Sequence, residues 1–223
     1  MINHQVWPVI HLSTPEIAYS NAAIASRCGC SGVFLIHMEG KDDQLDPVAI
    51  EIKRRHPDLL VGLNYLSLPA HIALARSLSL GMDATWTDKS GVRSDRVDSM
   101  TTNAIEPMLK ENPGHLFFGS IAFKYQPEDL DPPKAALLAL DLGMIPTTSG
   151  LATGSAPNPK KLSAIRQAIG DRPLALASGV TPDNAYELSG FLSHILVSTG
   201  ISKSFHEFDE GELATLMGQV SPF

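Results

Sequence analysis

Hydrophobic residues occur along this chain in short continuous runs that alternate with amphipathic segments, at a repeat of about 25 to 30 residues. The runs are typical of strands buried on both faces, and they cover residues 7–12, 32–38, 59–66, 83–88, 115–125, 144–149, 173–178 and 194–200. The segments with helical spacing cover residues 15–29, 46–56, 69–81, 101–112, 132–143, 158–170, 181–192 and 211–220. This alternation predicts a (β/α)8 barrel that forms one domain over residues 1–223.

The alternative architecture is a doubly wound open sheet. That fold usually has fewer strands and a glycine-rich turn after the first strand, of the type GxGxxG. Here the first predicted strand runs into "HLSTPEIA" (residues 11–18), which contains no glycine. The pattern therefore favours the closed barrel.

Composition and charge exclude several classes of function. Hydrophobic residues make up 43% of the chain and charged residues 18%, which is typical of globular proteins. The net charge of −7 gives no basic patch, so we expect no nucleic-acid partner. No apolar run approaches the roughly 18 residues of a transmembrane segment, and the first residues lack the pattern of a secretory signal. We expect a cytoplasmic protein in which Cys28 and Cys30 are reduced.

Small residues follow the last three predicted strands, in "TTSGLATGSAPN", "SGVTPDN" and "STGISKS". In such barrels the loops after strands seven and eight often hold a phosphate, because their backbone N–H groups point at the anion. The candidate binding residues are Gly150, Thr153, Gly154, Ser155, Ser178, Gly179, Thr199, Gly200 and Ser202. The alternative is that these glycines only serve the turns, and Thr181 with Pro182 also makes an ordinary helix start.

Charged side chains stand at the predicted ends of other strands. Glu39, Asp88 and Lys124 are the candidate catalytic residues, because all would converge over the barrel mouth and exchange protons there. Lys124 could instead form a structural ion pair with Asp88 or Glu39. Asn64, inside an apolar strand, is a candidate ligand-binding amide or a structural bridge. His37 and Glu39 are too few for a metal site, so we expect no metal and no cofactor.

Several segments together resemble the BtpA family of (β/α)8-barrel proteins, in the same order along most of the chain. They include "GVFLIHMEG", "VGLNYLSLPAHIALARSLSLGMDATWTD", "FFGSIAFKY" and "LALASGVTPDNAYELS", of which the last is the least specific because other phosphate-binding barrels share its turn. The matching positions are Glu39, Asn64, Lys124, the turn at 152–154 and the turn at 178–184. The resemblance implies the barrel and a phosphate-type site. The chain departs from the family pattern after the first strand ("STPEIA") and the fourth ("TWTDKSG"), so its ligand is expected to differ.

Two hypotheses for function follow. The first is an enzyme that acts on a small phosphorylated metabolite, such as a sugar phosphate or phosphoribosyl compound, as an isomerase, lyase or transferase. Its last two loops resemble those of phosphoribosylanthranilate isomerase and tryptophan-synthase α-type barrels. The second is a non-catalytic assembly or regulatory protein that keeps a ligand site. Barrels of this kind often pair, which makes a homodimer a candidate assembly, but the sequence does not determine the oligomeric state.

Overall fold

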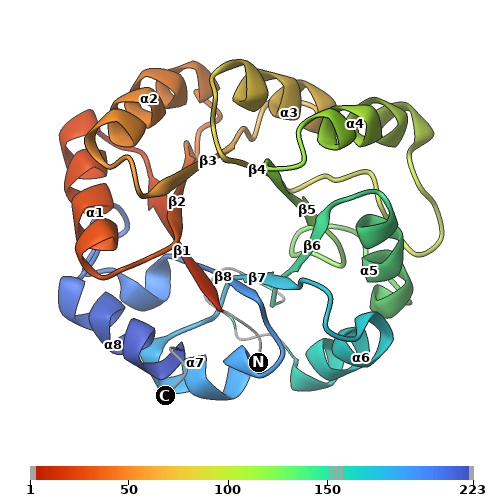
Figure 1. The fold of residues 1–223 in the computed structure, drawn as a ribbon. Coiled ribbons are helices and arrows are strands. Elements are labelled where there is room, and N and C mark those ends of the chain that lie inside the picture. Colours follow the sequence, from red (N-terminus) through yellow and green to blue (C-terminus); the bar gives the residue numbers. More distant parts are fainter. Residues whose placement is uncertain (1–3, 151, 153–154, 156–157, 221–223) are drawn as a thin grey trace.

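In a computed structural model, parallel strands form a closed barrel in the order β1 to β8, with β8 pairing back onto β1. The structure describes residues 4–150, 152, 155 and 158–220. Within these residues the strands are β1 Gln5–His11, β2 Gly32–Ile36, β3 Leu60–Asn64, β4 Ala84–Thr87, β5 Leu116–Ser120, β6 Ile145–Thr148, β7 Ala175–Ala177 and β8 His194–Val197. The (β/α)8 barrel expected from the sequence is confirmed (Figure 1).

A ring of helices surrounds the barrel, one after each strand (Figure 1). Their bounds are α1 Pro15–Arg27, α2 Leu45–Arg55, α3 Ala70–Ser79, α4 Ser99–Glu111, α5 Pro132–Asp141, α6 Pro159–Ile169, α7 Pro182–Ser189 and α8 Glu210–Val220. Two short 3-10 helices, η1 Asp42–Gln44 and η2 Thr199–Ile201, precede α2 and α8. Among the described helices, none has the length and apolar character needed to cross a membrane.

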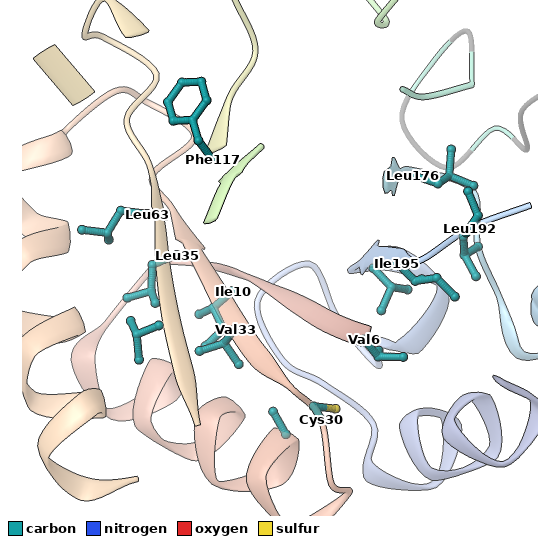
Figure 2. Close-up of a cluster of buried hydrophobic side chains, with 14 of the residues drawn as sticks. Val6, Ile10, Cys30, Val33, Leu35, Leu63, Phe117, Leu176, Leu192 and Ile195 are labelled. Atoms are coloured by element: carbon teal, nitrogen blue, oxygen red, sulfur yellow. The ribbon is translucent and has the colours of Figure 1, made fainter. Parts of the chain in front are cut away.

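Alternate strand residues divide the hydrophobic core into two layers. The inner layer fills the barrel with large aromatic side chains, including Trp7, Phe34 and Phe118, which pack edge to face or tilted at 5.1 to 5.7 Å between ring centroids. The outer layer, to which Val33, Leu35 and Leu63 belong, lies between the strands and the helices (Figure 2). This two-sided burial explains why the strands read as continuous apolar runs.

Glycines on neighbouring strands make room for the aromatic rings inside the barrel. A Cβ added at Gly62 would lie 2.3 Å from the ring of the fully buried Phe34. We expect Gly62→Ala to lower the free energy of unfolding by about 1 to 3 kcal/mol, as overpacking does in well-packed cores. Urea denaturation measures the loss. Gly114→Ala is the control, because no heavy atom lies within 4 Å of its added Cβ. An equal loss in both variants would contradict tight packing of Phe34.

The strand predicted over residues 115–125 ends five residues earlier in the structure, at Ser120. The chain turns sharply there, because Ala122 and Tyr125 have positive φ angles of 44° and 61°. Lys124 therefore lies in a turn and not at a strand end. The run predicted over residues 194–200 likewise stops at Val197 and continues as η2. After β5 the apolar sequence continues past the point where the backbone leaves the barrel, whereas after β8 the small polar residues 198–200 form the turn.

Candidate functional site

The turn after β7 has a conformation that exposes its backbone amides. Ser178 and Gly179 both have positive φ, at 142° and 76°. Asn184, on α7, stabilises this turn by two hydrogen bonds. Its Oδ1 accepts from the N–H of Thr181 at 2.8 Å, and its Nδ2 donates to the Gly179 carbonyl at 2.9 Å. The amide side chain in "SGVTPDN" thus sets the path of the turn.

The turn after β8 packs directly against the turn after β7. A Cβ added at Gly200 would lie only 2.1 Å from the Val180 carbonyl oxygen, so no larger residue fits without displacing one turn. Ser202 Oγ donates to the Ser198 carbonyl at 2.8 Å, and the Ile201 N–H donates to the same oxygen at 2.9 Å. Ser202, a predicted binding residue, therefore closes the η2 turn through its hydroxyl.

Four backbone amides of these two turns have no acceptor among the described residues. Across residues 4–150, 152, 155 and 158–220, the N–H groups of Gly179, Val180, Thr199 and Gly200 donate to no protein acceptor. Unpaired amides at the start of a helix carry partial positive charge and attract an anion. We call the turns 178–180 and 198–200 the amide cradle.

The amide cradle lines a cavity of about 50 Å³ at the barrel mouth through residues 178–180, 198 and 199. This cavity is also lined by His11, Trp86 and Lys124. Its volume exceeds the roughly 10–15 Å³ that one water needs, so a group of a few atoms fits. The cradle and two side chains able to carry positive charge therefore face a single small space.

Asn64 and Asp88 meet on another part of the mouth. Asn64 is fully buried at the end of β3, and its Nδ2 donates to Asp88 Oδ1 at 3.1 Å. Its Oδ1 is buried and has no hydrogen-bond partner among the described residues. A buried polar atom left unpaired is costly, so this oxygen is an unsatisfied acceptor beside Asp88.

Asp88 and Lys124 influence each other's ionisation. Burial raises the pKa of the Asp88 carboxyl above its usual range, and the hydrogen bond from Asn64 and the charge of Lys124 oppose this shift. Burial lowers the pKa of Lys124, while the negative charge of Asp88 opposes the change. The turn that carries Lys124 is held by two contacts: its own N–H donates to Ser149 Oγ at 2.7 Å, and the Gln126 amide donates to the Asp88 carbonyl.

The Glu39 side chain pairs with Lys41 and not with Asp88 or Lys124. Its carboxylate forms an ion pair with Lys41 at 2.6 Å, and its side chain is 70% exposed. The hydrogen bond and charge of Lys41 lower the pKa of Glu39 below its usual range. The expected convergence is therefore found for Asp88 and Lys124, whereas Glu39 turns to its neighbour on the rim. The cause is local, because Lys41 is only two residues away.

The predicted residues after β6 divide into three groups. Gly150 is buried and lines a larger cleft beside the mouth. Ser155 is exposed, and its N–H donates to the Ala152 carbonyl at 3.1 Å. The same carbonyl accepts from Ser178 Oγ at 3.1 Å, which ties the β6 and β7 turns together. Thr153 and Gly154 lie outside the described residues.

Two residues that the sequence did not assign to the site have central positions. His11, the last residue of β1, is buried in the mouth, stacks on Phe205 at 4.4 Å between centroids, and places Nδ1 3.2 Å from the Phe205 carbonyl. Burial lowers its pKa. Lys161, on α6, donates to the carbonyls of Ala122 and Ser149. Alternation along β1 could have indicated His11, but helical spacing gave no sign of Lys161.

Comparison with known proteins identifies the fold and nothing finer. No protein-family model matches this chain, and no curated protein matches it. Solved structures match the fold of this chain. One of them, 3-hexulose-6-phosphate synthase, superposes with a TM-score of 0.75 at 15% sequence identity, covering 97% of this chain and 100% of that one. Membership of the BtpA family therefore stays a prediction.

Other similar structures are enzymes with related barrels. (S)-3-O-geranylgeranylglyceryl phosphate synthase from Thermoplasma acidophilum, in complex with sn-glycerol-1-phosphate, gives a TM-score of 0.69 at 16% identity over 98% of this chain and 93% of that one. Phosphoribosyl anthranilate isomerase from Thermus thermophilus gives 0.67 at 12% identity over 97% and 98%. At such identities the likeness is one of fold, and these substrates belong to those proteins.

Proposed function

We propose that this chain is an enzyme that binds a small phosphorylated metabolite in the barrel mouth and transfers a proton on it. The observation that carries the proposal is the amide cradle, whose unpaired N–H groups border the same cavity as His11 and Lys124. Amides and an ammonium group together favour a phosphate in that space. The similar barrels whose names include phosphorylated compounds lend support at the level of the fold.

Asp88 and Lys124 are the proposed acid–base pair. A carboxyl with a raised pKa and an amine with a lowered pKa both move toward neutral pH, where proton transfer is most efficient. Asn64 holds one oxygen of Asp88 and keeps its own Oδ1 for a hydroxyl of the substrate. A sugar phosphate or a phosphoribosyl compound has both the phosphate for the amide cradle and a hydroxyl for Asn64. An isomerase, a lyase or a transferase can use this arrangement, with Glu39 reaching the ligand from the rim.

Inorganic phosphate tests the cradle before any substrate is known. We expect phosphate to raise the thermal midpoint of the wild-type chain in proportion to occupancy. Gly179→Ala should weaken phosphate binding at least about tenfold, because alanine disfavours the positive φ that presents the amides. Isothermal titration calorimetry measures the affinity.

Gly170→Ala is the matched control for that variant. Gly170 also has positive φ, 63° against 76° at Gly179, and no heavy atom lies within 4 Å of its added Cβ. Both variants should lose stability, because both positions have a positive φ, but only Gly179→Ala should lose phosphate affinity. Absence of phosphate binding to the wild type, or equal affinity in both variants, would exclude the cradle.

A further inference from the structure

A cleft of about 740 Å³ opens beside the barrel mouth, between the segment that follows β5 and the start of α6. Its volume lies in the range of roughly 300 to 1,000 Å³ that is usual for small-molecule sites. Lys124 lines both this cleft and the mouth cavity. The mouth cavity and the cleft therefore adjoin at Lys124.

Lys161 presents a cation to the cleft. Its Nζ donates to the Ser149 carbonyl at 2.7 Å and to the Ala122 carbonyl at 3.0 Å. No carboxylate of the described residues forms an ion pair with it. An ammonium has three N–H donors, and the described residues accept from two of them.

The surroundings of Lys161 leave its charge uncompensated. The side chain is half-buried, and burial lowers its pKa to about 8. The other charged residues on the cleft are Lys124, Lys160, Glu128 and Asp129. The Asp129 carboxylate already accepts from Ser94 and from the Asp131 N–H, so its oxygens are engaged. A desolvated cation without a counter-charge is unfavourable, and a bound anion would offset that cost.

We infer that this cleft binds a second anionic group, a carboxylate or a phosphate, of the same metabolite whose first phosphate lies in the amide cradle. Lys161 is its anchor, and the substrate class is narrowed to phosphorylated compounds with two acidic groups. This inference rests on the proposed function, because the cradle fixes the other end of the ligand.

Fructose 1,6-bisphosphate and fructose 6-phosphate form a probe pair that differs by one phosphate. We expect the wild-type chain to bind the bisphosphate at least about tenfold more tightly, the factor expected for one charge-assisted hydrogen bond. In Lys161→Met this ratio should fall to about two or below. Lys110→Met is the control: it removes the same charge from an exposed residue of α4 that does not line the cleft, and it should keep the ratio. Calorimetry measures all affinities.

A crystal structure of the wild-type chain with fructose 1,6-bisphosphate gives a second measurement that needs no variant. One phosphate should lie in the amide cradle and the other within hydrogen-bonding distance of Lys161 Nζ. A second phosphate in solvent, a ratio near one in the wild type, or a ratio that survives Lys161→Met would overturn the inference alone. If neither sugar phosphate nor inorganic phosphate binds the wild type, the proposed function fails and the inference fails with it.

Discussion

Asp88→Asn is expected to lower kcat by about 10²- to 10⁴-fold while the barrel stays folded, the range typical of a lost general acid or base. Asparagine keeps the shape of Asp88 and can still accept from Asn64 Nδ2, so the change removes the proton-transfer group and little else. Steady-state kinetics on the phosphorylated substrate that a thermal-shift screen selects measures the loss. Lys124→Met should cause a loss of the same order.

Asp95→Asn is the control for Asp88→Asn. Asp95 follows the same strand, but its side chain is 65% exposed and pairs with Arg93 at 3.0 Å on the surface. Its turnover should stay within about twofold of wild type, since exposed pairs contribute little. Glu39→Gln tests the exposed acid at the rim apart from the buried Asp88 and Lys124. We expect it to lower kcat by about tenfold or less. If Asp88→Asn keeps more than a tenth of wild-type turnover, the assembly or regulatory hypothesis becomes the better one.

Stability against pH gives an independent check on Asp88. Its pKa is raised in the folded chain above the ordinary value of 3.8, so the folded state holds this proton more tightly than the unfolded state. The contribution of Asp88 to the free energy of unfolding should therefore fall as pH rises from 3.8 through the raised pKa. Asp88→Asn lacks this contribution. The difference in unfolding free energy should thus shift in favour of the variant between pH 3 and pH 7, as urea denaturation would show.

Gly200→Ala is expected to abolish measurable phosphate binding. The added Cβ would meet the Val180 carbonyl oxygen at 2.1 Å, so the turns after β7 and β8 must separate and their amides no longer converge. We also expect a loss of about 1 to 3 kcal/mol in unfolding free energy from the overpacking. Calorimetry with inorganic phosphate and urea denaturation measure the two effects.

Gly218→Ala controls for the loss of a glycine near the same end of the chain. Gly218 lies in α8, and no heavy atom lies within 4 Å of its added Cβ. Because alanine favours helix, this variant should be neutral or more stable by up to about 1 kcal/mol, with unchanged phosphate affinity. Wild-type affinity in Gly200→Ala would show that the two turns do not act together.

Much of the fold could be predicted because it depends on patterns that are local in sequence. Helix starts such as Thr14 before Pro15, and Asn158 before Pro159, carry caps that need no distant partner. The strands are long apolar runs whose burial on both faces follows from the barrel itself. The strand ends were less predictable, because Ala122 adopts a positive φ that its residue type does not signal.

The candidate site could be predicted where glycines in the sequence mark a turn. It could not be predicted where it depends on which hydrogen-bond or ion-pair partner a side chain contacts. The cradle follows from Gly179 and Gly200, which the sequence shows directly. Glu39 pairs with Lys41, two residues away. Lys161 donates to the carbonyls of Ala122 and Ser149, and both of these lie more than ten residues away in the sequence. No spacing rule separates these outcomes from the alternatives, because long charged side chains can reach several partners.

The sequence by itself determined the alternation of buried strands and amphipathic helices, and with it the barrel and the edge at which small-residue turns gather. Only the tertiary structure decided which polar groups meet there. It brought Asp88 to Asn64 and placed His11 and Lys124 on one cavity, and it gives the amides of Gly179, Val180, Thr199 and Gly200 no acceptor among the described residues. The physical reason is range: hydrophobic periodicity acts within each segment, whereas burial and hydrogen bonding in the mouth depend on contacts between strands far apart in the chain.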